Sequence, residues 1–184
     1  NTKNTISIMS VQLIVFPQTE LNNEFVIDGT NFNSINASSS YDSSSSGNVI
    51  LDVLTNQPPS PINTWFRFRS TSFGTPTLPT ETAGNLTLNS TTTFTFSGVY
   101  QKLSSLVVGT TYQMTVDLAT TGTGQLFTGA FNGTNIILQP ANSASQSQIT
   151  FSWTAASSED TIIISYLNTV ADNIAISNIS VLPQ

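Results

Sequence analysis

A stretch of alternating aromatic and basic residues, Trp65 to Arg69, offers side chains that could bind a ligand. On a strand, successive side chains point to opposite faces, so Trp65, Arg67 and Arg69 share one face, and Phe66 and Phe68 share the other. We expect the two phenylalanines to face the core and the tryptophan, with its flanking guanidiniums, to face outward. Such a group can hold a sugar ring, a carboxylate or a partner chain. Alternatively, the indole covers a sheet edge and the arginine stems lie over it.

Tyr100 and Gln101 are a second pair of candidate contacts. Sugar recognition needs an aromatic ring for the apolar sugar face and planar polar groups for the hydroxyls. Together with Trp65, Arg67 and Arg69, these two residues form the predicted glycan- or partner-binding set.

The residues needed for catalysis are missing or scattered. The chain has neither histidine nor cysteine, which excludes a Ser–His–Asp triad, an imidazole zinc site, thiolate metal sites and disulfides. A glycosidase needs two carboxylates facing each other across a cleft. Glu159 and Asp160 are neighbours, but in an extended chain they would point apart, which indicates a charged turn. We therefore predict that the chain is not an enzyme.

Charge is scarce along the 184 residues, which carry four basic and ten acidic side chains and a net charge of −6. Ser, Thr and Asn take the surface positions that charged residues usually fill, and their hydration does not depend on pH or salt. That composition suits an extracellular or virion-surface location. Binding to nucleic acid is not expected, because phosphate recognition needs a basic stripe. Membrane insertion is not expected either, because no apolar stretch is long enough to cross a bilayer.

Alternating runs of apolar and polar residues predict the elements that carry these side chains. The clearest run, Thr111 to Leu118, predicts a strand with one wet and one buried face. Phe94 to Leu103 predicts the strand before it, with a bulge or bend at Ser97-Gly98. Between the two strands, we expect the apolar residues Leu106 to Val108 to lie beneath the sheet.

The rest of the chain also reads as short strands with turns between them, and no helical periodicity is found. The predicted strands are Asn48–Leu54, Trp65–Arg69, Asn85–Leu88, Gln125–Phe131, Thr134–Leu138, Ile149–Thr154, Ile162–Leu167 and Ile174–Val181. Ser34 to Asn48 is polar and is predicted to be an exposed loop. Asn132-Gly133 predicts a type I′ hairpin turn, with positive φ at both residues. Trp153 lies in an apolar series and is predicted to be a core residue. About ten short strands indicate an all-β sandwich or barrel with antiparallel sheets.

The N-terminal segment has an unusual pattern. Ile6 to Phe16 is apolar on both faces, which predicts a strand that is covered on two sides. Either it is an internal strand of its own domain, or residues 1–18 form an interface or donor strand that is lent to a neighbouring subunit. The remaining residues, 19–184, are predicted to form one domain.

The segment Gly98 to Leu118, GVYQKLSSLVVGTTYQMTVDL, resembles the core of galactose-binding-like jelly rolls, particularly the carbohydrate-binding modules of secreted glycosidases. Glu20–Phe25 is similar to the opening segment of that family, and Asn178–Val181 is similar to its closing strand. The resemblance implies a two-sheet antiparallel jelly roll and a tendency to bind glycans on a concave face or at loop tips.

The same resemblance raises the question of a structural calcium ion, which this family often holds between an opening acidic residue and the Asp of the closing strand. Here Ser177 takes the place of that Asp. Glu24 and Asp172 are weak candidates for oxygen ligands. We expect no metal and no other cofactor.

Three functions are compatible with these features. The first, which we favour, is a non-catalytic structural or attachment protein on the outside of an extracellular particle, a virion, as a capsid decoration or fibre-type protein. Its partners would be other structural proteins, further copies of itself and a cell-surface glycan. The alternatives are a carbohydrate-binding module of a secreted bacterial glycoside hydrolase, and a subunit of a surface filament or adhesin.

Overall fold

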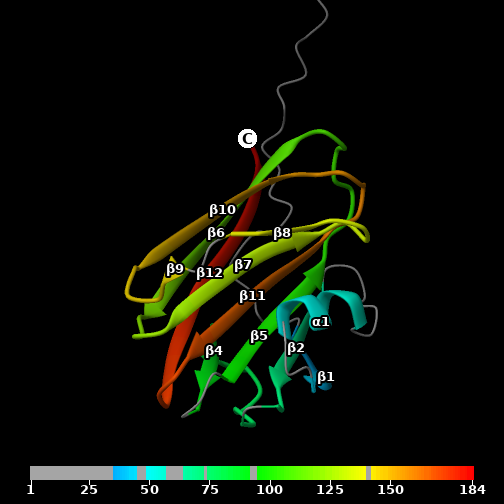
Figure 1. Ribbon diagram of the computed structural model, residues 1–184. Helices are drawn as coiled ribbons and strands as arrows, with labels where there is room; N and C mark the ends of the chain where they lie inside the picture. The colour runs from blue at the N-terminus through cyan, green and yellow to red at the C-terminus, as the bar shows by residue number, and fades with distance from the viewer. Residues whose placement is uncertain (1–34, 45–48, 57–63, 73, 92–94, 140–141) are drawn as a thin grey trace, which may run out of the picture.

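The computed structural model describes residues 35–44, 49–56, 64–72, 74–91, 95–139 and 142–184. Within them, two β-sheets lie face to face and form a sandwich (Figure 1), as the sequence predicted. The predicted N-terminal strand and the segment Glu20–Phe25 lie outside the described residues.

The first sheet has seven strands, in the order β1-β2-β5-β11-β7-β8, and β9 also pairs with β7. Their bounds are β1 (Ile35–Ser43), β2 (Trp65–Ser70), β5 (Thr95–Lys102), β7 (Gln125–Phe131), β8 (Ile136–Leu138), β9 (Asn142–Ser143) and β11 (Thr161–Asn168). All pairs are antiparallel except β1 and β2, which are parallel. The predicted antiparallel sandwich is therefore confirmed, with one parallel pair at this edge.

The second sheet has five strands, in the order β10-β6-β12-β4-β3. Their bounds are β3 (Thr80–Thr82), β4 (Asn85–Ser90), β6 (Thr111–Thr120), β10 (Gln148–Thr154) and β12 (Asp172–Pro183). From β4 onward, the chain passes repeatedly from one sheet to the other, which is the wrapping of a jelly roll.

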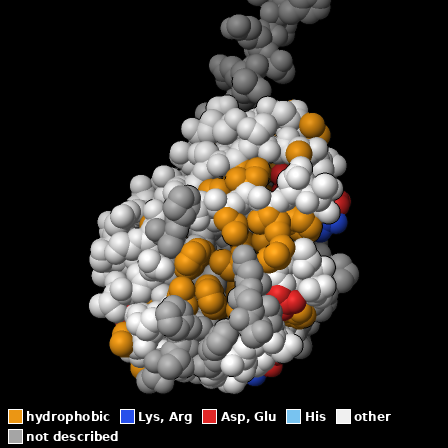
Figure 2. All heavy atoms as spheres, in the orientation of Figure 1, with side chains coloured by type: hydrophobic (Ala, Val, Ile, Leu, Met, Phe, Trp, Pro, Cys, Tyr) orange, Lys and Arg blue, Asp and Glu red, His pale blue; other side chains and the backbone are white. Residues whose placement is uncertain are grey.

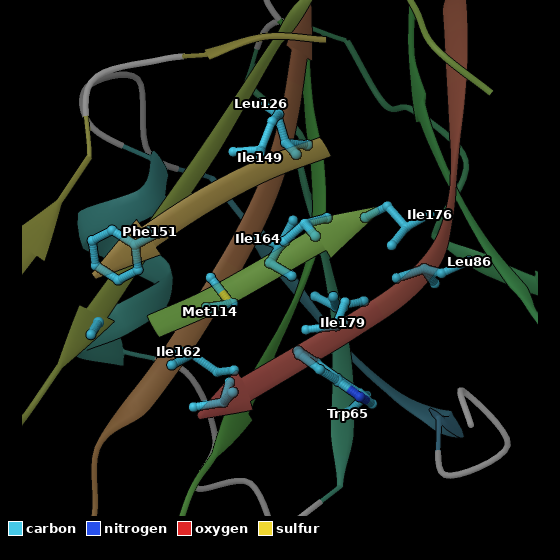
Figure 3. Close-up of a cluster of buried hydrophobic side chains, with 14 of the residues drawn as sticks. Trp65, Leu86, Met114, Leu126, Ile149, Phe151, Ile162, Ile164, Ile176 and Ile179 are labelled. Carbon is cyan, nitrogen blue, oxygen red and sulfur yellow. The ribbon is translucent and has the colours of Figure 1, made fainter. Parts of the chain in front are cut away.

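The main core lies between the sheets and follows the alternation read from the sequence. On β6, the residues Tyr112, Met114, Val116 and Leu118 are buried in it. Trp153 is also part of this cluster, as predicted. Side chains from both sheets, among them Met114, Leu126 and Ile164, point toward one another in Figure 3. This burial of apolar side chains is the main force that holds the two sheets together.

A second apolar cluster covers the outer face of the seven-stranded sheet. The helix α1 (Val49–Asn56) places Val49, Ile50, Val53 and Leu54 in it, together with Phe66, Phe68, Tyr100 and Ile163. The predicted strand Asn48–Leu54 is thus wrong. The four apolar residues lie on one side of a helix, because positions one turn apart share a face. A short apolar run does not distinguish a helix from a strand.

The segment Ser34–Asn48 is also different from the prediction of an exposed loop, because it contains β1. Although β1 is polar, the side chains of Tyr41, Asp42 and Ser43 have partners. Tyr41 and Ser43 donate hydrogen bonds to the Asp52 carboxylate on α1, and Ser43 is buried. Burial alone would raise the pKa of Asp52, but hydrogen bonds from Ser43, Asn56 and Tyr41 lower it overall. Side-chain bonds to the helix hold in place a strand that has little apolar surface.

The predicted bulge at Ser97-Gly98 is absent, because β5 pairs with β11 in unbroken register there. Gly98 instead allows a close approach of its neighbours. A Cβ atom at this position would lie 2.3 Å from the carbonyl oxygen of Ile164 and 2.5 Å from Cζ of Phe68. The residue is needed for packing and not for a bend.

Two predicted connections are only partly right. Asn132-Gly133 does join β7 to β8, but of the two only Gly133 has positive φ, so the turn is not type I′. Asn132 Oδ1 accepts hydrogen bonds from the backbone N–H groups of Thr134 and Asn135 and closes a longer loop. In the connection before β6, Leu106 is buried as predicted, but Val107 and Val108 are both 62% exposed.

Candidate functional site

Trp65 does not lie on the outside of the protein. It is 3% exposed and belongs to the core between the sheets, while Phe66 and Phe68 lie on the opposite face, under α1. The period-two alternation was predicted correctly, but the two faces were assigned the wrong way round. The reason is the helix α1, which covers the outer face of β2, so that Phe66 and Phe68 are buried on that face and Trp65 is buried on the other. Trp65 is placed here to fill the core.

Arg67 and Arg69 lie on the same side of β2 as Trp65 and reach the loop that precedes β3. Arg67 Nη1 donates to the carbonyl oxygen of Pro79 at 3.2 Å, and Arg69 Nη1 donates to that of Pro76 at 3.3 Å. Arg69 also forms a two-pronged ion pair with Asp42, with N–O distances of 2.9 and 3.1 Å. Both guanidiniums thus fix the loop that precedes β3, and Arg69 also fixes β1 at the edge of the sheet. This arrangement is close to the alternative in which the arginine stems cover a sheet edge.

Tyr100 and Gln101 point to opposite faces of β5, and both are buried. Tyr100 is fully buried beside Phe66 and Phe68, with ring-centre distances of 5.6 and 6.4 Å. Gln101 is 4% exposed, and its Oε1 has no hydrogen-bond partner among the described residues. The structure therefore brings Gln101 to the same side of the sheet as Trp65 and the arginines, and places Tyr100 on the other side.

Each carboxylate in the described residues has a non-acidic partner. Lys102 pairs with Glu159, while Trp153 Nε1 donates to Asp160 Oδ2 at 3.0 Å. These two acids therefore point apart, as predicted for a charged turn. Asp160 is 1% exposed, so it is a buried anchor for the Trp153 indole and not a surface charge. In these contacts, no two acids of the described residues share a side-chain partner.

Asp172 is held by hydrogen bonds that leave little room for a metal. Its Oδ2 accepts from the Tyr166 hydroxyl at 2.8 Å, the Thr123 N–H at 2.9 Å and the Asn168 amide at 3.2 Å. Burial alone would raise the pKa of Asp172, but hydrogen bonds from Thr123, Tyr166 and the Asn173 N–H lower it below its usual value. The described residues contain no group of three acids that could hold a metal. Glu24, the other candidate, lies outside them.

The outer face of the five-stranded sheet carries a group of neighbouring polar side chains. We call it the polar sheet face and define it by the outward side chains of its three adjacent strands, which are Gln148, Thr150 and Ser152 on β10, Gln113, Thr115 and Asp117 on β6, and Asn178 and Ser180 on β12. All eight are at least partly exposed. They alternate with core residues along each strand, so the same period that builds the core also builds this surface.

One row of the polar sheet face is fixed by its own hydrogen bonds. Gln148 and Asn178 lie on either side of Asp117 in register. Gln148 Nε2 donates to Asp117 Oδ1 at 2.7 Å, and Asn178 Nδ2 donates to Asp117 Oδ2 at 3.0 Å. The result is a carboxylate held between two amides across three strands. Bonds to a charged acceptor are stronger than neutral ones, so the row is well fixed.

The opposite side of the sandwich has a different character. In Figure 2, hydrophobic side chains gather at the centre of the face that carries α1 and the seven-stranded sheet. Phe96 and Phe127 are among its partly buried residues, with ring centres 5.9 Å apart. The two outer faces thus offer an apolar surface on one side and a hydrogen-bonding surface on the other.

Comparison with known proteins finds no matching family model and no matching curated protein. The solved structures that match are mostly carbohydrate-binding modules, as the sequence resemblance predicted. A family 4 module is 18% identical, with a TM-score of 0.48, over 72% of this chain and 98% of its own. A family 11 module from Clostridium thermocellum, in complex with a β-1,3-1,4-mixed-linked tetrasaccharide, is 13% identical, with a TM-score of 0.38, over 66% and 90%.

A third match is the enzymatically active domain of tailspike protein 4 of Bacteriophage CBA120. It is 12% identical, with a TM-score of 0.45, over 67% of this chain and 20% of that one. Identities and TM-scores this low carry no information about function, so the function is inferred from the surface described above. In the described residues, no helix is long and apolar enough to span a membrane.

The Gln148–Asp117–Asn178 row was not predicted from the sequence. Part of the signal was present, because Asp117 lies on the wet face that the alternation from Thr111 to Leu118 predicts. What the sequence did not reveal was the register between strands that are 31 and 61 residues apart. A pattern within one strand gives the face of a residue but not its cross-strand neighbour.

Proposed function

We propose that this chain is a non-catalytic glycan-binding protein displayed on the outside of an extracellular particle, a virion, and that the polar sheet face is its binding surface. One observation carries the proposal, namely the Asp117 carboxylate held between the amides of Gln148 and Asn178 on an open sheet face. The likeness of the fold to carbohydrate-binding modules agrees with it but does not identify a ligand.

The chemistry of this row suits sugar hydroxyls. A carboxylate accepts hydrogen bonds from two neighbouring hydroxyls, while the Gln148 amide and the hydroxyl groups around it both donate and accept. Because Gln148 and Asn178 already hold Asp117 in place, little side-chain freedom would be lost on binding. The neighbouring hydroxyls of Thr115, Thr150 and Ser180 extend the same surface along the strands.

The charge of the surface narrows the ligand class to neutral glycans. A sialylated or sulfated glycan would be repelled by Asp117, and the protein as a whole has a net charge of −6. The basic residues of the described chain have partners elsewhere. Lys102 pairs with Glu159, Arg69 with Asp42, and Arg67 with the Pro79 carbonyl.

The virion setting rests on the charge-poor surface rich in Ser, Thr and Asn and on the two-sided apolar N-terminal segment. The alternative setting is a carbohydrate-binding module of a secreted bacterial glycoside hydrolase, which the jelly-roll fold favours. Light scattering on the full chain distinguishes them. We expect a homo-oligomer for a structural protein of a particle, and a monomer for an enzyme-linked module.

A glycan array tests the binding surface directly. We expect the full chain to bind neutral glycans and Asp117→Asn to bind them at least about 10-fold more weakly, since hydrogen bonds to a charged group contribute about 1.5 to 3 kcal/mol. Glu159→Gln is the matched control, because it also removes one exposed negative charge but lies off the polar sheet face. Equal binding by Asp117→Asn and the native chain, or no neutral glycan bound at all, would overturn the proposal.

A further inference from the structure

The strand β10 is a free sheet edge with no protection against further pairing. It pairs with β6 on one side, over seven residues and without a register shift, and is the terminal strand of its sheet in the described chain. Its sequence, QITFSWT, contains no charged residue and no proline. Natural proteins usually block a long, regular edge with charge, proline, a bulge or a cover.

The other sheet edges in the described residues are short or blocked. The strands β3, β8 and β9 have three, three and two residues. The strand β1 carries a register shift and the Asp42–Arg69 ion pair. Only β10 combines length, regularity and lack of charge, so it is the edge best suited to accept another strand.

The register shows which backbone groups of β10 are available. At its two ends, Leu118 N–H donates to the Ser147 carbonyl and Ala155 N–H donates to the Thr110 carbonyl. Hydrogen-bonded residues alternate along an antiparallel pair, so the odd-numbered residues of β10 face β6. The N–H and C=O groups of the even-numbered residues, including Thr150 and Ser152, therefore point toward the free edge.

The same side of the sandwich also leaves core-facing apolar surface uncovered. Ile137 on β8 lies opposite Ala130, a core residue, and so points to the inner side of its sheet, yet it is 40% exposed. Ile137, Trp153 and Asp160 line one small pocket between β8 and the end of β10. Figure 1 shows β8 and β10 at the same margin of the molecule. A strand added beside β10 would cover Ile137.

The N-terminal segment Ile6–Phe16 has the length and pattern of such a strand. It has eleven residues, no charge and no internal proline, and lies within the 34 residues that precede β1. At its centre, Met9, Val11 and Leu13 alternate with Ser10 and Gln12, and the face of these two polar residues also carries Ile6, Ile8, Ile14 and Phe16 nearer the ends. Placed beside β10, the series with Met9, Val11 and Leu13 would face Ile137 and the core, and Ser10 and Gln12 would lie at the centre of the opposite face, beside the polar sheet face.

Closure within one chain would be awkward. The described chain begins with β1, which is at the far edge of the seven-stranded sheet from β7 and β8. The 18-residue link, residues 17–34, would have to return across the width of that sheet. A neighbouring copy imposes no such path.

We propose that β10 accepts the N-terminal strand Ile6–Phe16 of a second copy of this chain, with Ser10 and Gln12 on the solvent side and Met9, Val11 and Leu13 toward the core. A strand lent by each copy to the next would build the assembly by strand addition. The proposal does not depend on glycan binding, so each can fail without the other.

Cysteine trapping tests this pairing without background, because the chain contains no cysteine. Full-length chains with the single substitutions Ser152→Cys and Ser10→Cys or Gln12→Cys, carrying different mass tags, are mixed, unfolded, refolded together and oxidised. We expect disulfide-linked mixed dimers, since both sites would lie on the same face of adjacent strands. Val11→Cys is the matched control, because its side chain would point to the opposite face, and it should not link to Ser152→Cys.

Three outcomes would overturn the proposal. The first is that no mixed dimer forms from either polar position. The second is that Ser152→Cys links to itself as readily as to the N-terminal variants, which would mean β10-to-β10 pairing. The third is that a Ser10→Cys, Ser152→Cys double variant closes within one chain and stays a monomer, which would mean that each copy keeps its own strand.

A proline substitution provides an independent measurement. Ser152→Pro removes an N–H group that points to the free edge and leaves the bonds between β10 and β6 intact. We expect the native chain to be an oligomer by light scattering and Ser152→Pro to be a monomer that still unfolds cooperatively. A native monomer, or an unchanged mass in a Ser152→Pro chain that melts cooperatively, would contradict strand addition.

Discussion

Substitution of Trp65 by alanine separates a structural role of this residue from a ligand-binding role. Trp65 is 3% exposed and belongs to the main core. A tryptophan buries roughly 200 Å² of surface, worth about 5 kcal/mol at about 25 cal/mol per Å². Alanine keeps a small part of this, and tryptophan-to-alanine changes in cores cost about 3 to 5 kcal/mol. We therefore expect Trp65→Ala to lower the free energy of unfolding by about 4 kcal/mol.

Urea denaturation followed by fluorescence measures this loss. The chain has two tryptophans, so in Trp65→Ala the signal comes from Trp153, which stacks on Phe151 with ring centres 5.6 Å apart. With a slope of about 2.5 kcal/mol per molar urea, the midpoint should fall by about 1.5 M. Trp65→Phe is the matched control and should lose less, because much of the buried area is kept.

The opposite result would refute the placement of Trp65 in the core. If Trp65→Ala kept the native unfolding midpoint but lost glycan binding, the indole would have to lie on the surface, as the sequence pattern alone suggested. If both the stability and the binding were unchanged, the side chain would be neither a core residue nor a contact. The predicted result is a large loss of stability, with native affinity for glycan well below the melting temperature.

Three further predictions follow from the hydrogen bonding and packing of the described residues. Gly98→Ala should lower the free energy of unfolding by about 3 kcal/mol in urea titrations, because its Cβ would lie 2.3 Å from the Ile164 carbonyl oxygen; a loss below about 0.5 kcal/mol would contradict this. The pKa of Asp172 is lowered in the folded state, so its stabilisation is present above the unfolded pKa of about 4 and fades as the pH falls through the folded pKa. Asp172→Asn should therefore cost about 1 to 2 kcal/mol at neutral pH, and this difference should shrink in acid; a difference that is constant with pH would argue against the bonded carboxylate. Burial raises the pKa of Tyr166 to about 12, so ultraviolet titration of Tyr166→Phe should match the native curve up to about pH 11 while the protein stays folded. If the Tyr166→Phe curve instead lacked one tyrosine that titrates near pH 10 in the native protein, the Tyr166 phenol would be exposed.

The sequence predicted the parts of the fold that depend on alternation within one strand. The faces of β6 and β10 are as expected, because one side of each meets the core and the other meets water. On β2 the same reasoning gave the correct period and the wrong orientation. There, α1 covers the outer face, and the sequence pattern of β2 contains no information about a helix that packs on it.

The candidate site was harder to predict, because it depends on register. Asp117 could be assigned to the wet face, but its neighbours Gln148 and Asn178 come from strands distant in sequence. The wrong prediction for β1 has a related cause. Its stability comes from the Tyr41 and Ser43 bonds to Asp52 and from pairing with β2, and local composition does not show these contacts.

The most direct test of the binding surface is a two-dimensional NMR titration of the amide-labelled chain with a neutral glycan selected on the array. We predict that the shifted amide signals belong to Gln113–Asp117, Gln148–Ser152 and Asn178–Ser180, the segments that form the polar sheet face. Shifts confined to the opposite side, around Phe96 and Phe127, would contradict the claim that the Asp117 row binds the glycan.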